Sequence, residues 1–372
     1  MKNIQLNPHL LTVPLYVAGK PIEEVEEEYG LHDVVKLGSN ENPLGPSPLA
    51  VGAFQEALKD AHRYPGVADK WLRQKLAAVY NAQDGASFSE QNFLTGNGLG
   101  DVLRMIAHAF FFDGGEAIYC DPTFPLYPIF TKVFGAIAVS VPHDNFRYDL
   151  ETIAKTITAR TRVIFICNPN NPTGTVVTRD EVAALMERVP ESVVVVFDES
   201  YYDFVEDGDY SNSIDYVKGG RDNVLVLRGF SKIYGMANLR IGYAIGTRAM
   251  IEYLAHAQIV FNTGDPILRA AAAALDDRAH VEATRELIVR EREFLQRGFA
   301  ELDLSYVPSQ TNFILLTDLP RDVQAINEGM LRRGVIIRPM GGFGLPHAIR
   351  VTVGMREQNE KMLQALKGVL GQ

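Results

Sequence analysis

The chain has 372 residues, of which 47% are hydrophobic and 22% charged, and its formal net charge is −10 at pH 7. This length exceeds what one hydrophobic core usually supports, so we expect two domains. The negative charge and the lack of a basic run argue against a nucleic-acid partner, and no apolar stretch approaches the length that a bilayer requires. The two cysteines and eight histidines show no metal-binding spacing. We therefore expect no metal centre, no membrane partner and a cytoplasmic protein.

Short β-branched runs alternate with helical patterns between about residue 90 and residue 260. The runs predict strands at 91–95, 116–120, 136–141, 162–167, 193–198, 223–227 and 241–245. Helices are expected between them, for example at 101–111 and at 178–188, where Thr178 and Glu181 have the spacing of a capping box. This series predicts an α/β architecture: a large domain over residues 44–265 with a mostly parallel seven-stranded sheet covered by helices.

The pattern changes from Pro266 onward. An alanine-rich helix and a long charged helix near 278–301 precede predicted strands at 312–316, 335–338 and 349–353, and a last helix is predicted at 355–369. This mixture predicts a smaller α+β domain, formed by residues 266–372 together with the N-terminal residues 1–43.

The segment 229–240 is the most informative part of the chain. Lys232 lies among aromatic and aliphatic residues, which disfavour its charged form and leave the amine able to attack a carbonyl. Ser231 before it and Arg240 after it could hold a phosphate, the arginine through two hydrogen bonds. These residues suit an aldehyde cofactor that carries a phosphate, although a surface Ser-Lys pair beside a strand arginine would have the same sequence.

Polar segments also follow three of the predicted strands. The turn at 96–100 precedes a helix and is either a phosphate cradle or only a tight turn. The loop at 168–174 is rich in asparagine and proline, as a rigid amide site or a simple connection would be. Asp198 ends a buried strand and needs a partner, which a protonated pyridine nitrogen would provide. The carboxyl ends of parallel strands meet at one edge of a sheet, so we expect these segments to lie together.

The order and spacing of these features resemble the class I and II aminotransferases of the pyridoxal 5'-phosphate (PLP) fold type I group. Within that family the chain is most similar to the histidinol-phosphate aminotransferase branch, in the segments 15–24, 39–48, 63–65 and 348–354. The resemblance covers nearly the whole chain. It implies transamination between L-histidinol phosphate and 2-oxoglutarate in histidine biosynthesis, with a small-molecule amino donor and a 2-oxo acid as partners.

The resemblance also implies a role for each matching position. Lys232 would be the catalytic residue, joined to PLP as a Schiff base and carrying the proton, and Asp198 would pair with the ring nitrogen. The other cofactor contacts would be Asn171 and Tyr201 at the phenolic oxygen, Phe124 on the ring, and Leu99, Gly100, Ser231, Arg240 and Tyr64 at the phosphate. Tyr64 would reach across from a second subunit, which implies a homodimer. Substrate recognition would fall to Arg350, Arg338 and Tyr16.

One segment and one further residue depart from that branch. Gly98-Leu99-Gly100-Asp101 stands where Gly-Ser-Asp-Glu is usual, so the phosphate site would lose a side-chain hydroxyl and keep its backbone N–H groups. Phe124 stands where a tyrosine is usual. Aromatic amino-acid aminotransferases share this scaffold, so phenylalanine or tyrosine with a 2-oxo acid is the alternative substrate pair. A PLP-dependent decarboxylase or lyase is a remoter alternative, because the bond that breaks depends on how the substrate is oriented.

Overall fold

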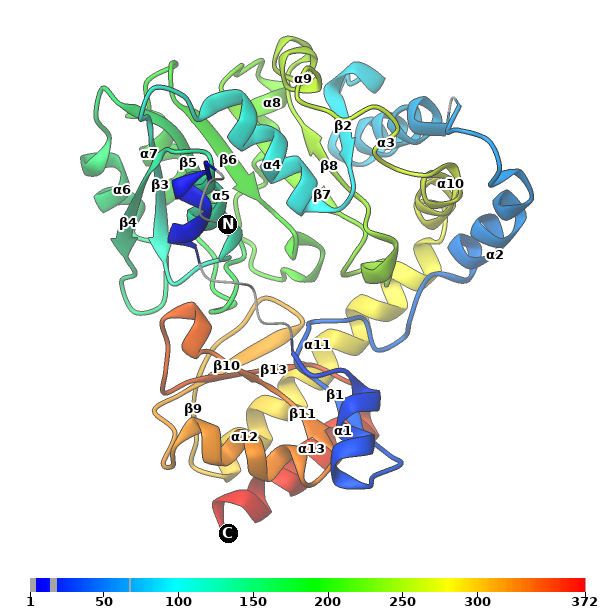
Figure 1. Cartoon of the computed structure of the whole chain (residues 1–372), viewed down its shortest axis with the longest axis vertical. Coiled ribbons are helices and arrows are strands. Elements are labelled where there is room, and N and C mark those ends of the chain that lie inside the picture. The colour runs from blue at the N-terminus through cyan, green and yellow to red at the C-terminus, as the bar shows by residue number, and fades with distance from the viewer. Residues whose placement is uncertain (1–4, 14–18, 67, 372) are drawn as a thin grey trace.

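The structure is a computed structural model that describes residues 5–13, 19–66 and 68–371. Figure 1 shows two lobes, the upper one built on a seven-stranded sheet and the lower one on a four-stranded sheet. The long helix α11 (Arg278–Glu301) runs from the upper lobe into the lower one. The predicted boundaries at residues 44 and 266 stay predictions.

The large sheet has the strand order β2-β8-β7-β6-β5-β3-β4. Its strands are β2 (Phe93–Gly96), β3 (Glu116–Asp121), β4 (Ile137–Pro142), β5 (Thr161–Cys167), β6 (Val194–Asp198), β7 (Val224–Gly229) and β8 (Gly242–Ile245). Strand β8 runs antiparallel to both of its neighbours, and the other neighbouring strands pair in parallel. The predicted mostly parallel seven-stranded sheet is therefore confirmed.

Helices cover this sheet on both faces. As a result, every residue of β6 is buried, and only one residue each of β5 and β7 is partly exposed. Runs of valine, leucine and isoleucine are what such a doubly covered strand requires. The helices are α2 (Pro48–Ala57), α3 (Ala68–Asp84), α4 (Leu99–Phe110), α5 (Leu126–Val133), α6 (Leu150–Thr156), α7 (Arg179–Met186), α8 (Ile214–Lys218), α9 (Arg248–Ala255) and α10 (Asp265–Ala274). The capping box of Thr178 and Glu181 begins α7 as predicted.

The lower lobe combines an antiparallel sheet, in the order β12-β13-β10-β9, with a short parallel pair, β1-β11. Its strands are β1 (Val35–Lys36), β9 (Ser305–Val307), β10 (Phe313–Thr317), β11 (Val335–Ile336), β12 (Arg338–Pro339) and β13 (Ile349–Thr352), and its further helices are α1 (Ile22–Tyr29), α12 (Val323–Leu331) and α13 (Arg356–Leu370). The prediction of a single strand at 335–338 is wrong. The chain pairs with β1 at 335–336 and then crosses at Ile337 to pair with β13, so two short strands belong to two different sheets.

The two lobes meet where the central strands of the large sheet end. Tyr201 follows β6 and Ile233 follows β7, and both belong to a buried cluster with Phe313 and Val351 of the lower lobe. Loops at the carboxyl ends of β6 and β7 are therefore held against the small sheet. In sheets of this kind the carboxyl ends of the strands are where ligands bind.

Candidate active site

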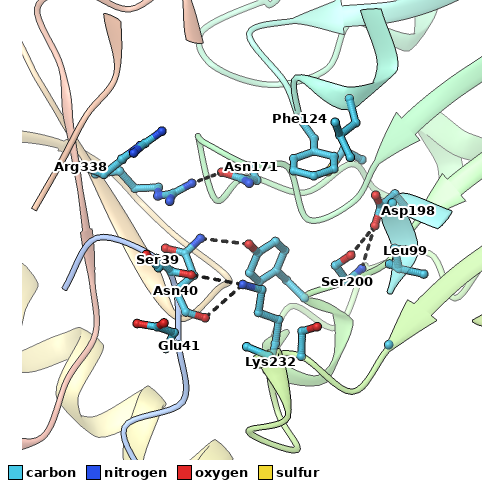
Figure 2. Close-up of a pocket in the computed structure, with 18 of the residues that line it drawn as sticks. Ser39, Asn40, Glu41, Leu99, Phe124, Asn171, Asp198, Ser200, Lys232 and Arg338 are labelled. Carbon is cyan, nitrogen blue, oxygen red and sulfur yellow. Dashed lines mark hydrogen bonds between the residues drawn. The ribbon is translucent and has the colours of Figure 1, made fainter. Parts of the chain in front are cut away.

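A cavity of about 350 Å³ lies at this junction. Figure 2 shows that its side chains converge from both lobes. Its lining includes Gly38, Ser39, Asn40, Glu41, Leu99, Gly100, Phe124, Cys167, Asn171, Asp198, Ser200, Tyr201, Ser231, Lys232, Arg240, Arg338, Phe343 and Arg350. Among the described residues, the cavity thus brings together every site residue predicted from the sequence except Tyr64.

Lys232 occupies the centre of the cavity, three residues after β7. Its Nζ atom donates hydrogen bonds to the backbone oxygens of Asn40, at 3.2 Å, and Ser39, at 3.4 Å. Burial, together with the positive charge of Arg350, lowers the pKa of Lys232 to about 7. A large fraction of this amine is therefore uncharged at neutral pH and able to act as a nucleophile or base.

Asp198 ends strand β6 with its carboxylate buried. Oδ1 accepts hydrogen bonds from the hydroxyl and the backbone N–H of Ser200, at 2.5 and 3.2 Å, and Oδ2 accepts one from the Tyr127 hydroxyl at 2.8 Å. Burial raises the pKa of Asp198, and these hydrogen bonds oppose that rise. A protonated ring nitrogen in the cavity would stabilise the ionised carboxylate, so the residue fits the partner expected from the sequence.

Phosphate-binding groups lie at the beginning of α4. Gly98 has φ +73°, a backbone conformation that favours glycine, and the Arg240 guanidinium packs directly against it. Leu99 and Gly100, the first residues of α4, and Ser231 line the cavity beside it. The backbone N–H groups of a helix N-terminus together with a guanidinium form a site suited to a phosphate dianion, even without a side-chain hydroxyl at Leu99.

Two arginines face the cavity from neighbouring strands of the small sheet. Arg338 of β12 pairs in register with Arg350 of β13. The buried guanidinium of Arg350 donates hydrogen bonds to the side-chain oxygen of Asn171 and, at 3.1 Å, to the backbone oxygen of Gly38. Guanidinium groups bind carboxylates and phosphates through paired hydrogen bonds, so this wall of the cavity is suited to an anionic substrate.

Two predicted site residues are not placed in the cavity. Tyr64 is 81% exposed and stacks on Phe261, with 4.8 Å between the ring centres. It contributes nothing to the cavity of its own chain, and its predicted role in a second subunit stays a prediction. Tyr16 lies outside the described residues.

Several residues of the site were not predicted from the sequence. Asn40 donates a hydrogen bond from Nδ2 to the Tyr201 hydroxyl at 2.9 Å (Figure 2). Asn40 lies in the segment 39–48, which supported only the resemblance and was given no role. Tyr127 and Ser200 hold Asp198. Ser200 is near Asp198 in sequence, whereas no pattern in the chain indicates the contact made by Tyr127.

Neither a metal cluster nor a membrane helix accompanies this site in the part of the chain that the structure describes. Within residues 5–13, 19–66 and 68–371, no group of three or more histidine, cysteine, aspartate or glutamate side chains is arranged to hold a metal ion. Over the same ranges, no helix has the length and apolar character needed to cross a bilayer.

Comparison with known proteins gives consistent matches over nearly the whole chain. The family described as aminotransferase class I and II matches residues 32–366. The histidinol-phosphate aminotransferase of Moorella thermoacetica is 44% identical over 361 residues, which cover 97% of this chain and 92% of that protein. The corresponding enzyme of an Anaeromyxobacter species is 40% identical, with 98% of each chain covered.

Solved structures agree with the sequence matches. The histidinol-phosphate aminotransferase of Sinorhizobium meliloti in complex with pyridoxal-5'-phosphate superposes with a TM-score of 0.89 at 26% identity, covering 99% of this chain and 98% of that one. The aspartate aminotransferase of Thermus thermophilus with maleate gives a TM-score of 0.83 at 25% identity, covering 98% and 100%.

Proposed function

We propose that this chain, which belongs to the aminotransferases of class I and II, binds PLP and transfers an amino group from L-histidinol phosphate to 2-oxoglutarate. The products would be imidazole acetol phosphate and L-glutamate, in a step of histidine biosynthesis. The observation that carries the proposal is the placement of Lys232, with its lowered pKa, in one cavity with the arginine pair Arg338 and Arg350. This choice of substrate is supported by the sequence identity of 40–44% to histidinol-phosphate aminotransferases over nearly the whole chain.

The residues of the cavity fit PLP group by group. When bound, PLP supplies an aldehyde and an electron-withdrawing pyridine ring. Asp198 would hold the protonated ring nitrogen, Asn171 and Tyr201 the phenolic oxygen, and Phe124 one face of the ring. The phosphate would lie against the backbone of Leu99 and Gly100 and against the side chains of Ser231 and Arg240.

Lys232 would move the proton. As an uncharged amine, Nζ would take a proton from the α-carbon of the amino donor and deliver it to the aldehyde carbon position of the cofactor, and in the opposite half-reaction it would carry a proton back from that position to the α-carbon of the product. The pKa of about 7 suits this exchange, because in each half-reaction the amine must be uncharged to take the proton and charged to deliver it. Arg350 and Arg338 would hold the phosphate of histidinol phosphate and the carboxylates of glutamate in turn, since guanidinium groups donate hydrogen bonds to both kinds of anion.

The substrate assignment is tested by half-reactions of the PLP-loaded protein with histidinol phosphate and with phenylalanine, each followed by the change in visible absorbance. We expect kcat/KM for histidinol phosphate to be at least about 100-fold higher, because phenylalanine carries no phosphate for the two arginines to bind. Lys232→Ala should show no turnover with either substrate. A preference for phenylalanine would instead select the aromatic amino-acid aminotransferase.

We further propose a homodimer that uses an exposed apolar surface on α2, α3, the residues that flank α2, and the segment before α10. This dimer surface is formed by Leu44, Leu49, Val51, Leu58, Tyr64, Trp71, Ile259, Val260 and Phe261, all more than a third exposed. Helix α10 packs against both α2 and α3, which brings these residues onto neighbouring elements (Figure 1). An apolar surface of this kind on a folded chain is typical of a protein–protein contact. In the dimer, Tyr64 of one subunit would complete the phosphate site of the other.

A further inference from the structure

Asn40 is a buried residue at the centre of the contacts between the two lobes. It is 1% exposed and adopts the left-handed backbone conformation, with φ +55°. Asparagine tolerates this conformation better than most residues. Its Nδ2 atom donates a hydrogen bond to the Tyr201 hydroxyl at 2.9 Å, and its backbone oxygen accepts one from Lys232 (Figure 2).

The orientation of the Asn40 amide is determined by Thr352 of β13. The Thr352 hydroxyl oxygen accepts a hydrogen bond from the backbone N–H of Asn40 at 2.9 Å, and its proton is donated to Oδ1 of the Asn40 side chain at 3.2 Å. With Oδ1 occupied by the Thr352 hydroxyl, the amide faces Tyr201 with its NH₂ group. A flipped amide would turn Oδ1 toward Tyr201 as an acceptor, and the Thr352 hydroxyl would lose Oδ1 as the acceptor of its proton.

This arrangement restricts what the Tyr201 hydroxyl can do. A tyrosine hydroxyl can donate its one proton and can also accept hydrogen bonds. The Tyr201 oxygen accepts a hydrogen bond from the Asn40 NH₂ group. Its proton is then left for an acceptor inside the cavity. The Tyr201 ring is buried and held edge-on by Phe313, with 5.1 Å between ring centres and 83° between ring planes, so the hydroxyl has a defined direction.

We propose that Asn40 is a positioning residue that makes the Tyr201 hydroxyl a hydrogen-bond donor to the phenolic oxygen of the cofactor. This inference rests on the proposed function, because it concerns how Tyr201 meets PLP. Residues 38 to 40 are also held from β13 at two points, since Arg350 donates to the backbone oxygen of Gly38 and Thr352 binds Asn40. The strand that carries the substrate-binding arginine therefore also fixes the Tyr201 donor.

The experiment is a pH titration of the visible absorbance of PLP bound to the protein. A donor at the phenolic oxygen stabilises its ionised form and so lowers the pH midpoint of the coloured species. In Asn40→Asp the new carboxylate accepts the hydrogen bond from the Tyr201 hydroxyl, so the phenolic oxygen of the cofactor loses its donor. We expect the midpoint to rise by about one pH unit, as for the loss of one hydrogen bond to a charged group. Asn40→Gly, which adopts the same backbone conformation and adds no charge, should shift it in the same direction.

A double-mutant cycle separates the effect on Tyr201 from the added charge. The charged and titratable groups around Tyr201 are Lys232, Arg350, Asp198 and Cys167, and none of them is changed in these variants. We expect Asn40→Asp to cause no further rise of the midpoint when Tyr201→Phe is already present. An equal rise in both backgrounds, or an unchanged midpoint in Asn40→Gly, would overturn the inference.

Asn42→Gly is the matched control for removing an amide from the same loop. The Asn42 side chain donates hydrogen bonds to the backbone oxygen of Ile233 and to Thr284, not to Tyr201. We expect its midpoint to equal that of the unchanged protein, and a shift as large as that of Asn40→Gly would show a general effect of the loop. If the unchanged protein shows no visible band with PLP, the proposed function itself fails. A normal band with an unmoved midpoint in Asn40→Gly refutes only the role of Asn40.

Discussion

Tyr127 donates a hydrogen bond from its hydroxyl to Oδ2 of Asp198 across 2.8 Å, although the two residues are 71 positions apart. The Tyr127 ring is stacked on Phe165, with 4.7 Å between ring centres and 5° between ring planes. This donor stabilises the ionised carboxylate, and Ser200 adds two more hydrogen bonds on Oδ1. In the proposed function, a carboxylate stabilised in this way would keep the proton on the ring nitrogen of the cofactor, where transamination needs it.

Tyr127→Phe should therefore lower kcat about tenfold, the effect of losing one hydrogen bond to a charged group. We also expect the ¹⁵N NMR signal of labelled PLP to move toward that of an unprotonated ring. Tyr148→Phe is the control, because this buried hydroxyl contacts Thr123 and not Asp198. An unchanged ring-nitrogen signal in Tyr127→Phe would contradict the role of the hydroxyl.

The lowered pKa of Lys232 predicts how the stability of the cofactor-free protein changes with pH. The pKa is 10.5 in an unfolded chain and about 7 in the fold. Between these values only the unfolded chain binds the proton, so the free energy of unfolding rises with pH, by at most about 1.4 kcal/mol per pH unit from this group. Denaturant titrations from pH 7 to 10 should show this rise in the unchanged protein relative to Lys232→Met. Parallel curves for the two proteins would mean that the amine is not perturbed.

Arg350→Lys should raise the KM for glutamate by about 100-fold with a smaller change in kcat. The reason is that lysine cannot reproduce the paired hydrogen bonds of a guanidinium to a carboxylate. Steady-state kinetics at saturating PLP measures the effect. Arg332→Lys serves as the control, since Arg332 is exposed and pairs with Glu328 in the same lobe. An unaltered KM in Arg350→Lys would place the carboxylate site elsewhere.

Phe261→Glu should dissociate the proposed dimer, because it places a charge in the apolar dimer surface beside Tyr64. Sedimentation or light scattering would then report a monomer, and PLP should be retained less tightly because Tyr64 no longer reaches the second phosphate site. Phe112→Glu is the matched control. Phe112 is 52% exposed, close to the 56% of Phe261, and lies outside the dimer surface. Equal dissociation in both variants, or in neither, would refute this surface.

Arg228→Met should destabilise the fold by about 3–5 kcal/mol. Arg228 and Glu199 form a fully buried ion pair between β7 and the end of β6, at 2.7 Å, so the substitution leaves an unpaired buried carboxylate. Lys155→Met breaks the exposed pair with Glu151 and should leave the free energy of unfolding nearly unchanged, because solvent screens an exposed pair. Urea unfolding of both variants tests the contrast, and similar small losses would show that the buried pair is not required.

Local patterns in the chain were enough to predict the large sheet and the residues around Lys232. Valine-rich runs such as 193–197 indicate doubly covered strands, and polar residues directly after these strands lie at one edge because parallel strands share a direction. Asp198, Asn171 and Lys232 accordingly meet in one cavity. The strand expected at 335–338 was wrong because pairing partners, and not the run itself, decide where a strand ends.

The amino-acid sequence by itself therefore determined where the seven strands of the large sheet lie along the chain and which chemical groups follow them, since both depend on neighbours along the chain. Only the tertiary structure decided how those groups are positioned and oriented relative to one another. Asn40 meets Tyr201 across 161 positions, and Arg350 meets Asn171 across 179. The physical reason is that a hydrogen bond depends on distance and angle, which are set when the two lobes pack against each other.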